Sequence, residues 1–367
     1  MDLKKILIFR TGHLGDTIVA VPALWAIRKA FHEAELTLLS NSDAQNPNYI
    51  SARAVLPENG LIDRWEAYPT NIGKLAAPTA WLKLLARLRN YRYEAVLYLM
   101  TRNRTSEQVE RDLWFFRAAG IKRVLCADYV RHNSLGTKVA NPTPRVEKEA
   151  EFLLDALASE GVAVDLGNYS TDLLLSKSET SSADGWIAAN CGGSGRLVAV
   201  APGSKWESKI WPEERFADVV AQLIGSIGIF PVILGGAEDR EKGDRLLSAW
   251  RTGANAAGQL SVRESAALLR RCELYLGNDT GTMHLAAAVG TPCVAVFAAI
   301  DWVGRWEPFG EGHKIFRRSV ECEGCHSPTC FNAGKCLALI APDQVLAACM
   351  EILAPVAATE NPRQSVG

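Results

Sequence analysis

Residues 4–16 are KKILIFRTGHLGD, a short apolar run that ends in a loop with two glycines. The apolar side chains of residues 6–9 suit a buried strand, and apolar residues recur at helical spacing over residues 17–31. A strand, a glycine loop and a helix in this order open a β-α-β unit. The alternation continues through the first half of the chain, where we expect strands at 35–39 and 95–99 and a helix at 81–92. This half is predicted to be a parallel α/β domain.

The second half of the chain repeats this alternation after a polar segment, SKSETSSA, at residues 176–183. We expect strands at 197–201, 230–234, 273–276 and 293–297, and helices at 212–227, 261–271 and 282–289. The predicted fold class is α/β, with two doubly wound sheets. Its parts are an N-terminal domain (1–175), a linker (176–183), a C-terminal domain (184–340), a last helix (341–356) and a loose tail (357–367).

Length and composition limit the classes of protein to consider. The chain has 367 residues, enough for two domains, and its 48% hydrophobic and 22% charged residues are ordinary for a folded protein. Its 40 lysines and arginines against 41 acids create no long-range field that would gather nucleic acid, so we expect no nucleic-acid partner. The first apolar run is shorter than the roughly 7–15 residues of a secretory signal. We therefore expect a cytoplasmic protein.

The loop after the first strand carries the first candidates for chemistry. Ligands of open α/β sheets bind at the carboxyl ends of strands, and this loop follows the first such end. Asp16 stands where a carboxylate either caps the next helix or accepts a proton from a substrate hydroxyl as a general base. His13 is a candidate for a contact with that substrate.

Two later loops offer places for phosphate. The first follows the strand at 197–201, and its Ser204, Lys205 and Lys209 suit either phosphate binding or plain exposure to solvent. The second is GNDTGTMH at 277–284, where the amides of Thr280 and Gly281 are expected at a helix N-terminus.

Two side chains of the second loop have two interpretations each. Asp279 would repel a phosphate, so it suits sugar hydroxyls beside the phosphate, or helix capping. His284 suits either a hydrogen bond to phosphate or packing within the helix. The sequence contains neither a GxxxxGK[ST] loop nor an Asp-x-Asp pair, so we expect no phosphate grip through a divalent cation and no catalytic cofactor.

These motifs in this order resemble the ADP-heptose heptosyltransferases of glycosyltransferase family 9. They are RTGHLGDTI and VPAL within 10–24, PGSK and SKIWPEERF within 202–216, and GNDTGTMHLAAA at 277–288. The resemblance spans most of the chain and implies the GT-B fold, in which two Rossmann-like domains face each other across a cleft. It also implies inverting, metal-independent transfer of a heptose from ADP-heptose to a hydroxyl. A last helix, near 342–353, would pack back toward the first domain.

The resemblance also implies roles for individual residues. Asp16 would be the general base, and Lys209 would stabilise the leaving ADP together with the helix N-terminus at Thr280 and Gly281. The other donor contacts would be Ser204 and Lys205 near the phosphates, Asp279 at the heptose, His284 at the diphosphate, Asp239 or, as second choice, Glu238 at the ribose, and Leu260 at the adenine. Lys205 stands where the family pattern has a hydroxyl residue.

Basic residues of the first half point to an anionic acceptor. Arg102, Arg104 and Arg111 follow the strand at 95–99 and suit a phosphorylated or carboxylated saccharide. With the resemblance, the expected acceptor is an inner-core saccharide of lipopolysaccharide or a related glycolipid, while proteins and small molecules stay open as alternatives. The basic stretch 81–92 contains no acid and is either a solvated helix face or a peripheral contact with the inner membrane at its cytoplasmic face.

Four of the nine cysteines are close together in the sequence, at Cys322, Cys325, Cys330 and Cys336. This density suits a structural zinc or iron site, and reduced thiols are the alternative. Three other functions stay open as well: a GT-B nucleotide-sugar epimerase, a transferase that uses another nucleotide sugar, and a non-catalytic sensor of sugar nucleotides.

Overall fold

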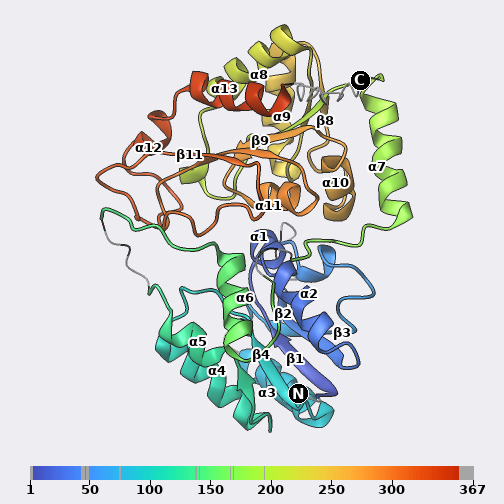
Figure 1. The fold of residues 1–367 in the computed structure, drawn as a ribbon, viewed down its shortest axis with the longest axis vertical. Helices are drawn as coiled ribbons and strands as arrows, with labels where there is room; N and C mark the ends of the chain where they lie inside the picture. The colour runs from blue at the N-terminus through green and yellow to red at the C-terminus, as the bar shows by residue number, and fades with distance from the viewer. Residues whose placement is uncertain are drawn as a thin grey trace, which may run out of the picture.

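Two parallel sheets, one in each half of the chain, form the frame of the molecule (Figure 1). The structure is a computed structural model that describes residues 3–42, 46, 49–73, 76–136, 139, 141–165, 167, 169–193 and 195–354. The sheet of the first half has the order β3-β2-β1-β4-β5, and that of the second half has the order β11-β10-β9-β6-β7-β8. The prediction of two doubly wound parallel sheets is confirmed.

The N-terminal sheet is built around β1, whose residues 6–9 are fully buried between β2 and β4. Its strands are β1 (Lys5–Phe9), β2 (Glu35–Ser42), β3 (Arg64–Pro69), β4 (Ala95–Tyr98) and β5 (Val124–Leu125). The helices of this half are α1 (Leu14–Ile18), α2 (Val21–Ala30), α3 (Ala77–Tyr91), α4 (Ser106–Ala118), α5 (Ala127–His132) and α6 (Glu149–Ser159), and η1 (Ala52–Ala54) is a short 3₁₀ turn.

The segment expected as one helix over 17–31 forms two helices, so that prediction is wrong. Pro22 lies in the first turn of α2. Proline has no backbone N–H to donate to the preceding turn, so it begins a helix well but does not continue one. The short helix α1 therefore ends at Ile18, and the glycine loop with α1 forms a separate structural unit next to the cleft.

The C-terminal sheet contains six strands, of which β6, β9 and β10 are buried along their whole length. They are β6 (Leu197–Ala201), β7 (Phe230–Ile233), β8 (Ala254–Asn255), β9 (Leu274–Asn278), β10 (Cys293–Phe297) and β11 (Lys314–Arg317). The helices are α7 (Lys177–Asn190), α8 (Glu213–Ile227), α9 (Arg240–Trp250), α10 (Val262–Leu269), α11 (Gly281–Ala288), α12 (Lys335–Ala338) and α13 (Pro342–Leu353), with 3₁₀ turns η2 (Glu207–Lys209) and η3 (Ala237–Asp239). In the described part of the chain, no helix has the length and apolar character needed to cross a membrane.

Two predictions about the outer parts of the chain are wrong. The polar segment 176–183, expected as the linker between the domains, is the start of α7, where the Ser176 hydroxyl accepts a hydrogen bond from the Glu179 amide as a helix cap. Small polar residues are common both at helix starts and in loops, so composition alone did not distinguish the two. The last helix, α13, packs against α8 rather than toward the first domain, because Val345 and Leu353 extend the core of the second sheet. The tail, 357–367, lies outside the described residues.

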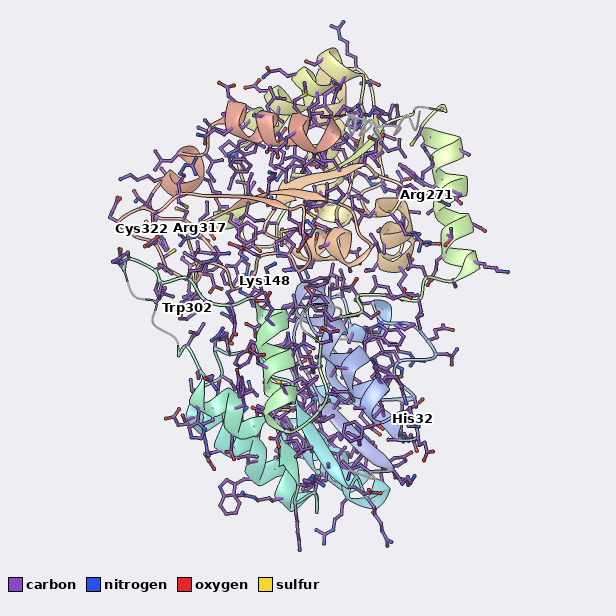
Figure 2. All side chains as sticks on the ribbon, viewed as in Figure 1. His32, Lys148, Arg271, Trp302, Arg317 and Cys322 are labelled. Carbon is purple, nitrogen blue, oxygen red and sulfur yellow. The ribbon has the colours of Figure 1, made fainter. Side chains whose placement is uncertain are left out.

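The two halves are joined by direct contacts as well as by the chain. Helix α1 of the first half lies against α11 of the second half (Figure 1). A buried ion pair joins Glu149, at the start of α6, to Arg305 of the second half at 2.9 Å. Figure 2 shows the neighbouring Lys148 where the two halves meet. The relative position of the two sheets is therefore fixed by packing and by buried charge.

Arg263 in α10 ties the second half to the connection between the halves. Its guanidinium donates to the carbonyls of Val55 (2.9 Å), Leu173 (3.0 Å) and Leu174 (3.0 Å) and pairs with Glu179. Burial would raise the pKa of Glu179, but hydrogen bonds, first from Arg263 and then from Ser176, outweigh burial and lower it. A lowered folded-state pKa contributes stability that is present at neutral pH and is lost as the pH falls through that pKa.

We expect Arg263→Ala to lower the free energy of unfolding by about 2 kcal/mol, because three carbonyls and a carboxylate lose their donor. Urea unfolding at neutral and acidic pH measures the effect. The loss should be largest at neutral pH, where Glu179 is charged, and Arg263→Lys should recover only part of it because lysine lacks the planar fork. An unchanged unfolding midpoint would show that these contacts do not hold the halves together.

Candidate active site

A cavity of about 440 Å³ lies between the two halves, at the carboxyl ends of their strands. The first half contributes Ile50 and the loop after β1, at 13–15. The second half contributes the loops after β6, β7 and β9, with Ala201, Gly203, Ser204, Lys205, Trp206, Lys209, residues 234–239 and residues 279–282. This is the position at which open α/β sheets bind ligands.

The wall formed by β9 and α11 suits an anion. Thr280 has extended backbone angles at the N-cap position of α11, and its side chain makes no capping hydrogen bond. Its hydroxyl is instead 2.8 Å from that of Thr282, which in turn is 2.9 Å from the Tyr275 hydroxyl. The amides of the first turn therefore have no side-chain cap, as a helix N-terminus that binds phosphate requires.

Lys209 and Asp279 form an ion pair on this wall, with 2.6 Å between Nζ and Oδ2. Both side chains are largely buried. Buried Ser208 fixes the turn before Lys209, since its hydroxyl donates to the carbonyl of Ser327 (2.6 Å). Asn278 ties the same loop to β9 by donating to the carbonyl of Pro202 (3.0 Å) and accepting from the amide of Trp211 (3.0 Å). A lysine is thus held beside the helix N-terminus by several independent contacts.

The loop after β7 brings two carboxylates into the cavity. Glu238 is exposed, and Asp239 is half-buried, with Oδ2 accepting a hydrogen bond from the Gly236 amide (3.1 Å). Gly203 and Gly235 lie so close to Asp239 that a Cβ on either would overlap its carboxylate. Burial, and then the neighbouring charge of Glu238, raises the pKa of Asp239. Both candidates for the ribose contact therefore line the cavity, whereas Leu260 packs against the core and does not.

On the opposite wall, Asp16 is the third residue of α1, and its side chain is 22% exposed. Its Oδ2 accepts a hydrogen bond from the His13 amide (2.9 Å), and its Oδ1 lies 3.8 Å from the guanidinium of Arg10. The capping interpretation of Asp16 is thus realised in the structure. His13, Leu14 and Gly15, which directly precede it, line the cavity, whereas Asp16 itself is not among the lining residues.

His284 lies behind the cavity, in the contact between α1 and α11. Its Nδ1 is buried and has no hydrogen-bond partner among the described residues, and a Cβ on Gly15 would come within 3.2 Å of the ring. Burial, and then the charge of Lys209, lowers the pKa of His284 to about 3. The imidazole is therefore neutral at physiological pH, and it does not line the cavity as the expected phosphate contact would.

The structure does not bring the three candidate acceptor arginines to the cavity. Arg104 and Arg111 both pair with buried Asp112, at 2.5 Å and 2.9 Å. Arg102 is itself buried, pairs with Glu147 (3.0 Å) and lies over the ring of Phe152. Acids of the first half already pair with these cations, and none of the three lines the cavity. Of the acceptor candidates, only His13 lines the cavity, with its ring 5.3 Å from that of Tyr49.

Several cavity residues were missed by sequence analysis. Gly235 and Gly236 line the ribose side, and Trp206 and Ile50 add apolar surface. A glycine pair directly after a predicted strand was an available signal for the first two. The position of Ile50 depends on a long connection after β2, for which the sequence contains no local signal.

The four clustered cysteines lie between β11 and α13, and none of them lines the cavity; Figure 2 shows Cys322 beside Arg317. Cys322 and Cys325 are exposed, Cys330 is half-buried and Cys336 is buried. Backbone amides donate to two of the sulfurs, from Gly334 to Cys330 (3.2 Å) and from Ala299 to Cys336 (3.4 Å). In the described ranges, no group of three or more His, Cys, Asp or Glu side chains is placed to hold a metal ion.

A structural metal at these cysteines therefore stays a prediction. If the four thiols close around zinc or iron, protein purified without chelator should contain about one equivalent of metal by elemental analysis. Cys322→Ser should remove that metal, while Cys126→Ser, a buried cysteine of the first half, should leave it in place. Less than about half an equivalent in the unmodified protein would identify the cluster as free thiols.

Comparisons with known proteins agree with this geometry. Residues 81–335 match the model of glycosyltransferase family 9 (heptosyltransferase). The chain belongs to glycosyltransferase family 9. Lipopolysaccharide heptosyltransferase 2 of Salmonella typhimurium is 33% identical over 107 residues, which are 28% of this chain and 30% of that relative. The local match therefore spans less than a third of this curated relative.

Two solved structures extend the family likeness over the whole fold. A family 9 glycosyltransferase from Veillonella parvula has a TM-score of 0.72 at 20% identity and covers 96% of this chain and 98% of its own. ADP-heptose LPS heptosyltransferase II of E. coli has a TM-score of 0.66 at 19% identity and covers 95% and 98%. The family 9 chain thus has the GT-B fold that its motifs predicted.

Proposed function

We propose that this family 9 protein transfers a heptose from ADP-heptose to a hydroxyl of an acceptor saccharide, with inversion at the sugar carbon. One observation carries the proposal. The cavity has a helix N-terminus and a lysine on its C-terminal wall, and the Asp16 carboxylate directly follows the residues of its N-terminal wall. A diphosphate leaving group and an attacking hydroxyl need these two kinds of group on opposite sides of the transferred sugar.

The donor would lie along the C-terminal wall. Its diphosphate would bind the amides of Thr280 and Gly281, with Lys209 and the loop at Ser204 and Lys205 beside it. The ribose would bind the carboxylates of Glu238 and Asp239. Asp279 would accept hydrogen bonds from the heptose, while still orienting Lys209. The structurally similar E. coli protein is an ADP-heptose LPS heptosyltransferase, which supports this choice of nucleotide sugar.

The reaction is a direct displacement at the first carbon of the heptose. The acceptor oxygen attacks from the side opposite the diphosphate, the bond to the phosphate oxygen breaks, and Asp16 takes the hydroxyl proton. Negative charge grows on the leaving phosphate, so Lys209 and the α11 amides stabilise the transition state more than the ground state. These groups supply the positive charge that a metal ion provides in other transferases, so no catalytic metal is invoked.

For the acceptor, the comparisons support a class of molecule rather than one compound. The curated relative is a lipopolysaccharide enzyme, which favours an anionic inner-core saccharide or glycolipid as the acceptor. His13 and Ile50 are the first-half side chains that would meet it. We infer that the enzyme works at the cytoplasmic side of the inner membrane, where such an acceptor and a soluble nucleotide sugar meet.

A donor panel tests the proposal. The protein is incubated with ADP-heptose, ADP-glucose, UDP-glucose and UDP-N-acetylglucosamine, with and without lipopolysaccharide core acceptor, and release of the free nucleoside diphosphate is followed. The expected result is acceptor-dependent release of ADP from ADP-heptose. Epimerised UDP-N-acetylglucosamine would identify an epimerase, turnover of another donor a different transferase, and tight ADP binding without turnover a sensor.

A further inference from the structure

Helices α3 and α4 form an outer surface of the first half that combines exposed apolar side chains with positive charge. Leu82 of α3 is 65% exposed and Trp114 of α4 is 67% exposed, both unusually high for large apolar residues. Arg89 and Arg117 are exposed beside them. We call these four residues, Leu82, Arg89, Trp114 and Arg117, the α3–α4 patch.

Contacts between α3 and α4 bring the four residues together on one surface. The rings of Trp81 and Phe115 pack against each other at 5.5 Å and so join α3 to α4, and Leu82 and Trp114 are their direct neighbours. Arg89 reaches across the groove between the helices to the carbonyl of Ala118 (3.4 Å). The guanidinium of Arg117 lies 5.8 Å from the centre of the Trp114 ring. The helices lie at the end of the first half that faces away from the second half (Figure 1).

The charge around the patch is positive. Helix α3 contains Lys83, Arg87 and Arg89 and no acid, and of these Arg87 pairs with Glu66 of β3 (3.0 Å). The acids of α4 are largely occupied, because Asp112 is buried under Arg104 and Arg111 and Glu110 pairs with Arg131. Glu107, in the first turn of α4, is the exposed acid of this surface.

We propose that the α3–α4 patch docks the protein on an anionic lipid bilayer. Trp114 has the ring type enriched at membrane interfaces, Leu82 would enter the acyl boundary, and the arginines would meet lipid phosphates. Charge complementarity selects this partner. A second copy of this chain would bring the same cations to the contact, and the two patches would repel each other. A protein partner would need acids to match these cations. This docking proposal rests on the exposure and charge of the patch and does not depend on the proposed function.

Vesicle sedimentation tests the proposal without any sugar substrate. The full chain is mixed with vesicles of phosphatidylglycerol and phosphatidylcholine or of phosphatidylcholine alone, at low and high salt. We expect binding to the anionic vesicles that falls at high salt and is weak on the neutral ones. The double variants Leu82→Ser/Trp114→Ser and Arg89→Glu/Arg117→Glu should each weaken it by roughly tenfold or more.

The matched control is Phe331→Ser/Leu339→Ser, which removes two other exposed apolar side chains, in the second half, the first of them 92% exposed. This variant should bind vesicles like the unmodified protein, and ADP affinity should be equal in all variants. Equal vesicle binding by control and patch variants, or no binding by the unmodified protein, would overturn the proposal. A dimer that Leu82→Ser/Trp114→Ser dissociates, without vesicle binding, would also overturn it and identify an interface between copies. Vesicle binding without heptose transfer would contradict the proposed function alone.

Discussion

Asp16→Asn should reduce heptose transfer by roughly 10²–10⁴-fold while leaving ADP affinity nearly unchanged. The amide has almost the shape of the carboxylate and can still accept the hydrogen bond from the His13 amide, so the start of α1 should persist. What the variant loses is the capacity to take a proton from the acceptor hydroxyl. The measurements are the steady-state rate of ADP release with acceptor and the dissociation constant of ADP by calorimetry.

A capping role alone makes a different prediction for the same position. If Asp16 only caps α1, Asp16→Asn should keep most of the activity and Asp16→Ala should lose stability by about 1 kcal/mol. Thr105→Ala serves as the control for a lost cap, because Thr105 caps α4 through its side chain and lies outside the cavity. An active Asp16→Asn enzyme would remove Asp16 from the role of general base.

Lys209→Ala should lower the rate of transfer by roughly 10²–10³-fold, because it removes a charge from the phosphate that leaves. It should also weaken ADP binding far more than adenosine binding. The comparison of the two ligands by calorimetry isolates the phosphate contact, since adenosine does not reach the α11 amides. Lys205→Ala, a change at an exposed lysine of the same loop, should have a smaller effect.

The Lys209→Ala variant should also be less stable, because Lys209 forms an ion pair with Asp279. Lys209→Ala leaves a nearly buried carboxylate without its partner, which is destabilising. The double variant Lys209→Ala/Asp279→Asn removes both charges and should recover the stability but not the ADP affinity. Equal losses for ADP and adenosine in both variants would contradict a phosphate contact at Lys209.

The sequence predicted the strand ends and their loops well because their signals are local. Residues 6–9 and 197–201 are continuous apolar runs, and glycines or polar residues follow each of them, so the loops with Asp16 and Lys209 could be placed at the sheet edges. The helix N-terminus at Thr280 and Gly281 was predictable for the same reason, since one short segment contains the strand end and the helix start.

Features that depend on distant partners were not predictable from the sequence alone. The arginines expected at the acceptor site are neutralised by Asp112 and Glu147, and the charge pattern does not show which acids they meet. The clamp at Arg263 joins residues more than 80 positions apart, and α13 packs on α8 because of a shared core. His284 has a helical position that fits phosphate contact or packing equally well, and its burial depends on the approach of two distant segments, α1 and the one that contains Trp306.

The position of the diphosphate is the central claim, and a crystal structure with bound ADP tests it most directly. We predict the β-phosphate within hydrogen-bond distance of the Thr280 and Gly281 amides and of Lys209 Nζ, with the Asp16 carboxylate facing it across the cavity. A diphosphate bound elsewhere, or bound there with Asp16 turned away behind α1, would contradict the account.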